Sequence, residues 1–148
     1  MRIRLESPDQ IEVQRLIEAL DDYLEPLYPP ESQHGPDLAA LLKPDVLFAV
    51  ARSNEGTAIG CGAIVLCPEY GEIKRMFVTP SARGQGVGKR LLAFLEEQAR
   101  ARGRTRFFLE TGYLQPEAIA LYLGSGYRYC PPFGSYAEDP NSVFMCKT

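Results

Sequence analysis

The sequence predicts a single α/β domain in which helices cover the faces of a mixed β-sheet. Its 148 residues, 45% of them hydrophobic and 24% charged, have the size and composition of one globular domain. Strand-type segments alternate with amphipathic helical segments, and a strand–helix–strand unit at 71–110 requires a parallel pair with a right-handed crossover. We therefore expect one domain over residues 1–148, with about six to seven strands and about four helices.

The first third of the chain predicts a strand, a helix and a proline-rich loop. Residues 2–6 alternate polar and apolar side chains, as a strand does. Ser7 as N-cap, Pro8 in the first turn and Gln10 closing a capping box form a helix-start pattern. Four prolines within 25–36 prevent a continuous helix there and predict an ordered surface loop. The apolar positions between start and loop have helical spacing: Val13, Leu16, Ile17, Leu20 and Leu24.

The middle of the chain predicts a short helix followed by three strands. The helix is expected over 37–42. The first two strands, 46–52 and 57–66, are joined by a Ser-Asn-Glu-Gly turn that indicates a hairpin. The third strand covers 71–78 and ends before Thr79-Pro80.

The second half of the chain predicts two helices, each followed by strand segments. The apolar face of the first helix comprises Val87, Leu91, Phe94, Leu95 and Ala99. Gly103 is expected at its C′ position, with a strand following over 105–110. Pro116 opens the second helix, which Gly124 and Gly126 close. The last two strands are expected at 127–130 and 143–147, separated by a turn-rich stretch.

Charge and hydropathy argue against two classes of partner. A net charge of −3 and a pI near 5.2 give no basic footprint for nucleic acid. The first residues lack the apolar core of a signal peptide, and no apolar run approaches the ~20 residues that a membrane span needs. We expect a cytoplasmic protein that binds neither nucleic acid nor a membrane.

The cysteines and the single histidine predict no metal site and no disulfide framework. The four cysteines contain no C-x-x-C pair, and His34 is the only histidine in the sequence. In a reducing compartment such cysteines are small buried hydrophobes. A Ser-His-Asp or Cys-His arrangement would have to depend on His34, and no G-x-S-x-G elbow accompanies it.

A glycine-rich loop carries the strongest functional signal. Residues 83–88, Arg-Gly-Gln-Gly-Val-Gly, follow a strand and open a helix, so backbone N–H groups there can bind an anion. The dinucleotide fingerprint fails at Lys89, and the Walker A pattern fails at Arg83 and Arg90. The loop is therefore an anion site of neither common nucleotide type, or alternatively a glycine-rich connection with no ligand.

The remaining pattern, R-x-x-G-x-G, resembles the acetyl-CoA motif of the GNAT superfamily of N-acetyltransferases. The resemblance extends over 72–103, and 115–127 is similar to the second motif of that family. The element order also resembles its fold, so the resemblance covers the whole chain. Residues 109–112 and the tail 132–143 resemble a group of small bacterial acetyltransferases, some of which carry an indole-acetate-related label. The resemblance implies a GNAT-like domain that uses acetyl-CoA as co-substrate, in a family where homodimers are frequent.

The resemblance also implies which residues bind acetyl-CoA. The pyrophosphate is expected on the amides of 84–89, and the pantetheine arm beside the strand 76–78. The backbone N–H of Val78 or of Phe77 would polarise the thioester carbonyl. The family often has Asn where this chain has Gln115, whose amide is expected near the pantetheine arm. The full set is Met76, Phe77, Val78, Arg83, Gly84, Gln85, Gly86, Val87, Gly88, Lys89 and Gln115.

Three residues are catalytic candidates. Tyr122 matches the general-acid tyrosine of the family, although a tyrosine that only packs its helix on the sheet would look the same. An alkyl ammonium loses its proton only near pH ~10, so a carboxylate is wanted as base. Glu72 is the first candidate and Glu110 the second; alternatively each is simply paired with a neighbouring Lys or Arg, namely Lys74, Arg75 or Arg106.

The sequence leaves the acceptor open. Acidic and aromatic residues within 21–34 would suit a cationic amine, unless they are only a solvated acidic loop with core tyrosines. Arg75, Arg128 and the 133–142 stretch could instead hold a carboxylate, which would favour amino-acid-like acceptors. We expect acetyl transfer to the primary amine of a small molecule by direct attack. The alternatives are a non-catalytic acyl-CoA sensor and a protein or peptide N-acetyltransferase.

Overall fold

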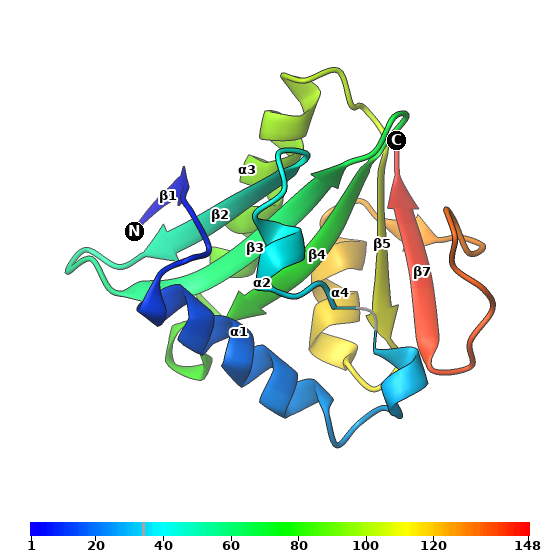
Figure 1. The fold of residues 1–148 in the computed structure, drawn as a ribbon, viewed down its shortest axis with the longest axis horizontal. Helices are drawn as coiled ribbons and strands as arrows, with labels where there is room; N and C mark the ends of the chain where they lie inside the picture. The colour runs from blue at the N-terminus through cyan, green and yellow to red at the C-terminus, as the bar shows by residue number, and fades with distance from the viewer. Residues whose placement is uncertain (34) are drawn as a thin grey trace.

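The computed structural model describes residues 1–33 and 35–148, and their strands form one mixed sheet in the order β1-β2-β3-β4-β5-β7-β6 (Figure 1). Only β4 and β5 are parallel neighbours. The strands are β1 Arg2–Leu5, β2 Val46–Arg52, β3 Ala58–Leu66, β4 Gly71–Val78, β5 Phe107–Gly112, β6 Arg128–Tyr129 and β7 Ser142–Lys147. The α-helices are α1 Ile11–Leu24, α2 Leu38–Leu41, α3 Val87–Arg100 and α4 Pro116–Gly124, and 3-10 turns cover Pro30–Ser32 and Pro80–Ala82.

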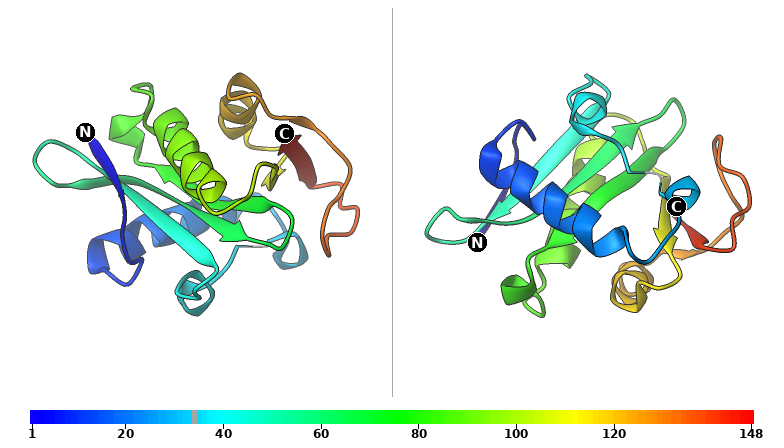
Figure 2. Two further views of the ribbon diagram at one scale, coloured as in Figure 1. Left: turned by 90° about the horizontal axis from the view of Figure 1, so that it is seen from above. Right: turned by 60° about the horizontal axis from the view of Figure 1, so that its bottom comes forward.

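The helices cover the two faces of the sheet unequally (Figure 2). Helices α1 and α2 lie on one face, and α3 and α4 lie on the other. The larger core lies between the sheet and α3, built around Leu91, Leu95, Phe107, Leu109 and Met145. A smaller core under α1 contains Val13, Leu16, Phe48 and Phe77. The predicted mixed α/β sheet with helices on both faces is thus confirmed. No helix among the described residues is long and apolar enough to cross a membrane.

The predicted start of the first helix is wrong. Helix α1 begins at Ile11, and its N-cap Gln10 makes no capping hydrogen bond. The side-chain amide of Gln10 instead donates to the Glu6 carboxylate at 3.1 Å and to the Ser7 carbonyl at 2.8 Å. The Ser7 hydroxyl accepts from the Asp9 amide, which closes a turn ahead of the helix. A capping box cannot form because Gln10 is bound to the end of β1.

Several other boundaries differ from the predictions by one or two residues. Strand β5 begins at Phe107, two residues later than expected, and continues to Gly112. Gly103 has the left-handed φ of 85°, but it lies one residue beyond the expected C′ position, because α3 ends at Arg100 with Ala101 as its C-cap. Strand β6 is limited to two residues. The order of the elements is as predicted.

The feature of the sheet that creates a site is the separation of β4 from β5. The two strands pair only at Gly71–Phe107, Glu72–Phe108 and Ile73–Leu109. Beyond Ile73 they diverge, which Figure 1 shows at their lower ends. Each strand has its other neighbour, β3 or β7, along nearly its whole length. An opening therefore exists in the middle of an otherwise continuous sheet.

Candidate active site

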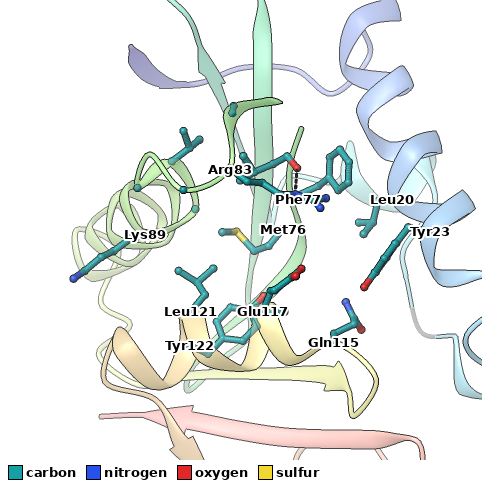
Figure 3. Close-up of a pocket in the computed structure, with 17 residues that line it drawn as sticks. Leu20, Tyr23, Met76, Phe77, Arg83, Lys89, Gln115, Glu117, Leu121 and Tyr122 are labelled. Carbon is teal, nitrogen blue, oxygen red and sulfur yellow. Dashed lines mark hydrogen bonds between the residues drawn. The ribbon is translucent and has the colours of Figure 1, made fainter. Parts of the chain in front are cut away.

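A cleft of about 470 Å³ lies at this opening, between the end of β4, the start of α3 and helix α4 (Figure 3). All but one of the predicted acetyl-CoA-binding residues line it. The exception is Gln85, whose side-chain amide lies 3.5 Å from the Ser81 carbonyl. The catalytic candidate Tyr122 lines the cleft as well. The remaining lining residues were not predicted for this site: Leu20, Tyr23, Ala82, Glu117, Ala118 and Leu121. Leu20 and Tyr23 belong to α1, which no local motif connects to the glycine loop.

The glycine loop presents free amides to the cleft. Gly84 and Gly86 have φ values of 80° and 78°, and a Cβ at either would meet nothing within 4 Å. Glycine is needed there for its backbone conformation, not for space. The first hydrogen bond of α3 runs from the Arg90 amide to the Gly86 carbonyl at 3.1 Å. The amides of 87–89 therefore have no acceptor within the helix, which makes its start suited to an anion.

Strand β4 offers backbone groups of its own to the cleft. The amide of Thr79 donates to the Ile59 carbonyl at 2.9 Å, which makes these two residues a hydrogen-bonded pair of the β3–β4 ladder. The next pair, Val78 opposite Gly60, is then a non-bonded pair, so the amide and carbonyl of Val78 face away from β3. The Val78 carbonyl indeed accepts from Arg83 Nε at 3.0 Å. Of the two predicted oxyanion donors, Val78 is the one on the cleft side.

The charged side chains at the mouth are of both signs. The Arg83 guanidinium, besides its bond to Val78, lies 5.7 Å from the centre of the Phe77 ring. Lys89 is exposed one turn into α3, and in Figure 3 its ammonium points away from the cleft. Glu117, in the first turn of α4, places a carboxylate on the opposite wall. Positive charge is thus concentrated at the α3 end of the cleft.

Tyr122 lies where the cleft passes through the sheet. It projects from α4, is only 7% exposed, and its ring contacts the edge of Tyr127 with 5.9 Å between centroids. Burial and, second, the charge of Glu110 raise the pKa of the Tyr122 hydroxyl well above its ordinary value of 10. The hydroxyl is therefore protonated at neutral pH. Tyr122 packs its helix on the sheet, as the packing alternative predicted, and it also lines both cavities at the opening.

A second cavity, of about 360 Å³, lies on the α1 side of the sheet and is mostly polar. It shares four residues with the first cleft: Leu20, Met76, Gln115 and Tyr122. Its remaining walls are α1, β4, the end of β5 and loop residues at 32–33, 35–36 and 141. The two cavities therefore meet at Tyr122, in the gap between β4 and β5.

The two candidate bases, Glu72 and Glu110, both line this second cavity. Glu72 is buried, and its Oε2 accepts from the Tyr136 hydroxyl at 2.7 Å and lies 3.1 Å from Lys74 Nζ. The Lys74 ammonium also donates to the Tyr136 hydroxyl at 2.7 Å. The predicted alternative for Glu72, pairing with a neighbouring lysine, is thus correct. Glu110 is the carboxylate whose charge contributes to the raised pKa of Tyr122.

A β-bulge in β4 sets the position of Arg75, and no sequence pattern indicated it. Between the pairs Cys61–Phe77 and Ala63–Lys74 the register shifts, so two residues of β4 oppose one of β3. Arg75 has φ of 57°, a left-handed conformation that costs a non-glycine residue about 1–2 kcal/mol. Its guanidinium bonds to Asp21 of α1 and, at 3.0 Å, to the Pro36 carbonyl. Arg75 thus faces α1, on the side of the second cavity.

The loops around the second cavity are tied to the sheet and to each other. The Tyr28 hydroxyl accepts from the Leu114 amide at 3.1 Å and lies 3.3 Å from Gln115 Oε1, which also accepts from the Gly112 amide. In Figure 3 the amide nitrogen of Gln115 points toward the cleft. A Cβ at Gly112 would overlap the Tyr28 hydroxyl. Close contact with Tyr28 therefore explains the glycine at the end of β5.

The C-terminal loop completes this enclosure. The Ser32 hydroxyl donates to Asp139 Oδ2 at 2.6 Å and accepts from the Asn141 side chain at 3.2 Å. Phe133 packs against Tyr70, Phe108, Tyr136 and Phe144. Predicted acceptor contacts are only partly brought together: Arg75 lines the cavity, Arg128 lies away from it on β6, and His34 lies outside the described residues.

The cysteines and acidic residues form no alternative centre. Within 1–33 and 35–148, no group of three His, Cys, Asp or Glu residues could hold a metal ion. All four cysteines are free thiols, and Cys61 and Cys146 are buried. Burial raises the pKa of Cys61 to about 12, so its thiol is not a nucleophile at neutral pH.

An opened parallel strand pair, a helix start rich in free amides and a buried tyrosine between two cavities define an acyl-CoA-dependent acyltransferase. The profile of the acetyltransferase (GNAT) family matches residues 13–127, and the chain belongs to that family. It is 53% identical over 147 residues to the IAA acetyltransferase of Azospirillum brasilense, covering 98% of this chain and 95% of the relative. It is 43% identical to the uncharacterized N-acetyltransferase YsnE of Bacillus subtilis, covering 80% of each.

A solved structure shows the same fold. The putative acyl-CoA N-acyltransferase from Klebsiella pneumoniae superposes with a TM-score of 0.84 at 41% identity, covering 99% of this chain and 95% of that one. The protein is therefore an N-acetyltransferase with acetyl-CoA as its co-substrate. The residues present fit acetyl-CoA, since the amides of 87–89 and the outward edge of Val78 lie along one cleft.

Proposed function

We propose that this N-acetyltransferase transfers the acetyl group to the primary amine of a small molecule by direct attack. The observation that carries the proposal is that two cavities of different chemistry meet at one buried tyrosine. The first cavity is lined by backbone amides and apolar side chains, and the second by charged side chains. An amine in the second cavity would approach the thioester at Tyr122 without a covalent enzyme intermediate, and Cys61 is too buried to provide one.

The first cleft would hold acetyl-CoA through main-chain groups. When bound, acetyl-CoA supplies an acetyl group activated as a thioester. The amides of 87–89 and the guanidinium of Arg83 would bind its pyrophosphate, helped by the positive end of the α3 dipole. The Val78 amide would donate to the thioester carbonyl oxygen, where negative charge develops during attack. Arg83 would have to release the Val78 carbonyl for the pantetheine arm to pair with β4.

Two side chains would move protons. The acceptor ammonium must lose a proton, and Glu110 is our choice of base because its charge contributes to the raised pKa of Tyr122. Glu72 remains the second candidate, although it already accepts from Tyr136 and is paired with Lys74. Tyr122, protonated at neutral pH, would donate to the departing thiolate of CoA.

Several contacts support a small acceptor over a protein. Tyr28 ties the loop after α1 to the β5–α4 loop, and Ser32 ties it to Asp139. These bonds fix the walls of a cavity of about 360 Å³, which is at the lower end of small-molecule sites. A peptide would need a longer groove. Free thiols on all four cysteines fit the cytoplasm as the compartment.

The test combines calorimetry with acetyl-CoA and a CoA-release assay over a panel of amines and peptides. We expect binding, together with CoA release by small primary amines. Absence of acetyl-CoA binding would overturn the assignment of the first cleft. Binding with no release by any acceptor would favour the sensor alternative, and release only by peptides would favour a protein acetyltransferase. Sedimentation of the same sample would show whether the chain forms a homodimer.

A further inference from the structure

We propose that the acceptor is zwitterionic: a small molecule whose primary amine lies beside Tyr122 and Glu110 and whose acid group, carboxylate or phosphonate, binds Arg75. This inference rests on the proposed function and names the substrate class of the same site. It is carried by the bulge in β4, the burial of Arg75 and the order of charges across the second cavity.

The bulge is what brings Arg75 into the second cavity. In a regular strand successive side chains alternate between the faces, so two neighbours cannot share one face. Lys74 and Arg75 are consecutive, yet both lie on the α1 side: Lys74 pairs across the ladder with Ala63 of the core under α1, and Arg75 bonds to Asp21 of α1. Met76, the next residue, contacts the α3 side, because a Cβ at Gly62 would meet both its sulfur and Leu95. The left-handed φ of 57° at Arg75 is the local departure that allows this.

Arg75 combines a strained backbone conformation with a long cationic side chain that lines the cavity, and this combination suggests that the side chain binds a ligand. Glycine or asparagine would adopt φ of 57° more readily than arginine does. Strained backbone conformations of this kind cluster at active sites and ligand-binding sites, and they persist because the surrounding structure fixes them. Here Cys61, opposite the bulge, lies with its Sγ 3.6 Å from the Arg75 carbonyl.

Arg75 retains hydrogen-bonding capacity inside the cavity. Its side chain is only 7% exposed. The two side-chain bonds it makes in the described part of the chain use Nε, to Pro36, and Nη1, to Asp21. A guanidinium has five N–H donors, so three remain for an acceptor group. A carboxylate or phosphonate is the group that matches such a planar fork, through two parallel bonds. Asp21, whose side chain is 54% exposed, balances the charge only from the rim.

The other charges of the cavity fix the orientation. Lys74 and Glu72 are paired with each other and with Tyr136, so Arg75 is the cation that we assign to the ligand. Glu110 is the lining carboxylate whose charge acts on Tyr122. The amine must lie at Tyr122, because the thioester is attacked there. The acid group of the same molecule then lies toward Arg75. An amine without an acid group would leave the donors of Arg75 unmatched, at a cost in binding.

The first experiment compares acceptors that differ only in the acid group. Matched pairs are β-alanine with propylamine, 4-aminobutyrate with butylamine, and L-leucine with 3-methylbutylamine, with 2-aminoethylphosphonate added as a phosphonate. We expect kcat/KM for the best acid-bearing acceptor to exceed that of its acid-free partner by about 10-fold or more, through KM. Equal or better transfer to the acid-free amines would overturn the inference and leave the proposed function intact. No transfer to any acceptor would overturn the proposed function.

The second experiment removes the charge. Arg75→Gln should raise KM for the acid-bearing acceptor by about 10–100-fold and leave KM for the acid-free amine within about 3-fold. A parallel rise in KM for both acceptors would mean that Arg75 only shapes the fold.

If Arg75→Gln does not fold, Asp21→Asn tests the same role of Arg75 by removing the carboxylate that pairs with it. Removing the counter-ion should lower KM for the acid-bearing acceptor selectively, by about 2–5-fold, and unchanged or higher KM would contradict the inference. Asp22→Asn, an exposed neighbour outside the cavity, is the matched control.

Discussion

The two cavities that meet at Tyr122 are built from different parts of the polypeptide. The proposed acetyl-CoA cleft is made mostly of two short stretches, 76–89 and 115–122, and presents main-chain amides. The proposed acceptor cavity takes side chains from α1, the loop after it, β4, β5 and the C-terminal loop. The first depends on backbone conformation and the second on which side chains the fold brings together.

Under the proposed roles, this difference would let one site hold a fixed co-substrate while side-chain substitutions change the specificity of the other. Main-chain amides at 87–89 remain whatever side chains the helix carries, provided that Gly84 and Gly86 keep their left-handed φ. In the acceptor cavity a single substitution removes a charge, as at Arg75 or Glu110. We therefore expect substitutions to separate co-substrate binding from acceptor selection, except at Tyr122, which belongs to both cavities.

The largest effect is expected at that shared residue. Tyr122→Phe should lower kcat by about 10²–10⁴-fold, because the thiolate of CoA loses its proton donor, while the Kd for acetyl-CoA changes little. Stopped-flow or steady-state CoA release measures kcat, and calorimetry measures the Kd for acetyl-CoA. An unchanged kcat would reduce Tyr122 to a packing residue.

The pH profile tests the same assignment without a mutation. If Tyr122 is the general acid that we propose, its protonated hydroxyl is the active form, and because its pKa is raised above 10 this form persists in alkaline solution. Wild-type kcat/KM should rise with pH as the amine loses its proton, and it should show no descending limb below about pH 10. A fall between pH 8 and 10 that Tyr122→Phe abolishes would mean that burial does not protect the hydroxyl.

The next largest effect separates the two carboxylates of the acceptor cavity. Glu110→Gln should lower kcat/KM at pH 7 by about 10²-fold and shift the rising limb toward higher pH, because the base is lost. Glu72→Gln should act mainly on stability, since it breaks the contacts with Tyr136 and Lys74. Thermal melts and pH–rate profiles of both variants decide the matter. The opposite pattern would restore Glu72 as the base.

A smaller effect is expected in the acetyl-CoA cleft alone. Gly86→Asp should raise the Kd for acetyl-CoA by about 10–100-fold, because it puts a carboxylate beside the amides of 87–89. Gly86→Ala is the matched control: it imposes the same left-handed φ without the charge and should cost about 1 kcal/mol of stability and little affinity. Equal affinities for both variants would show that the anion lies elsewhere.

The smallest effect should come from Glu117, the carboxylate on the α4 wall of the cleft. Glu117→Gln should lower the Kd for acetyl-CoA by about 2–3-fold at low salt, and the gain should disappear at high salt. Calorimetry at two ionic strengths measures it. A higher Kd for the variant at both ionic strengths would mean that Glu117 contacts the ligand favourably.

The sequence predicted local features well because their causes are local. The strands 46–52 and 71–78 and the helix after the glycine loop were predicted from periodicity and turn residues a few positions apart. The first-helix start was wrong for a partly non-local reason, since the Gln10 side chain accepts from Arg52 of β2 at 3.1 Å and also donates to the nearby Glu6. The bulge at Arg75 depends on β3 and gives no pattern within β4 itself.

What the sequence by itself determined is the glycine loop of the proposed acetyl-CoA cleft: left-handed glycines and a helix start are properties of consecutive residues, and they offer backbone amides that do not depend on side chains from elsewhere in the chain. What only the tertiary structure decided is the acceptor cavity. Tyr28 contacts Gly112, which lies 84 residues further along the chain, and Ser32 bonds to Asp139, 107 residues away. Arg75 bonds to Asp21, 54 residues before it. Such contacts depend on the packing of α1 and two loops on the opened sheet, and no spacing in the chain encodes them.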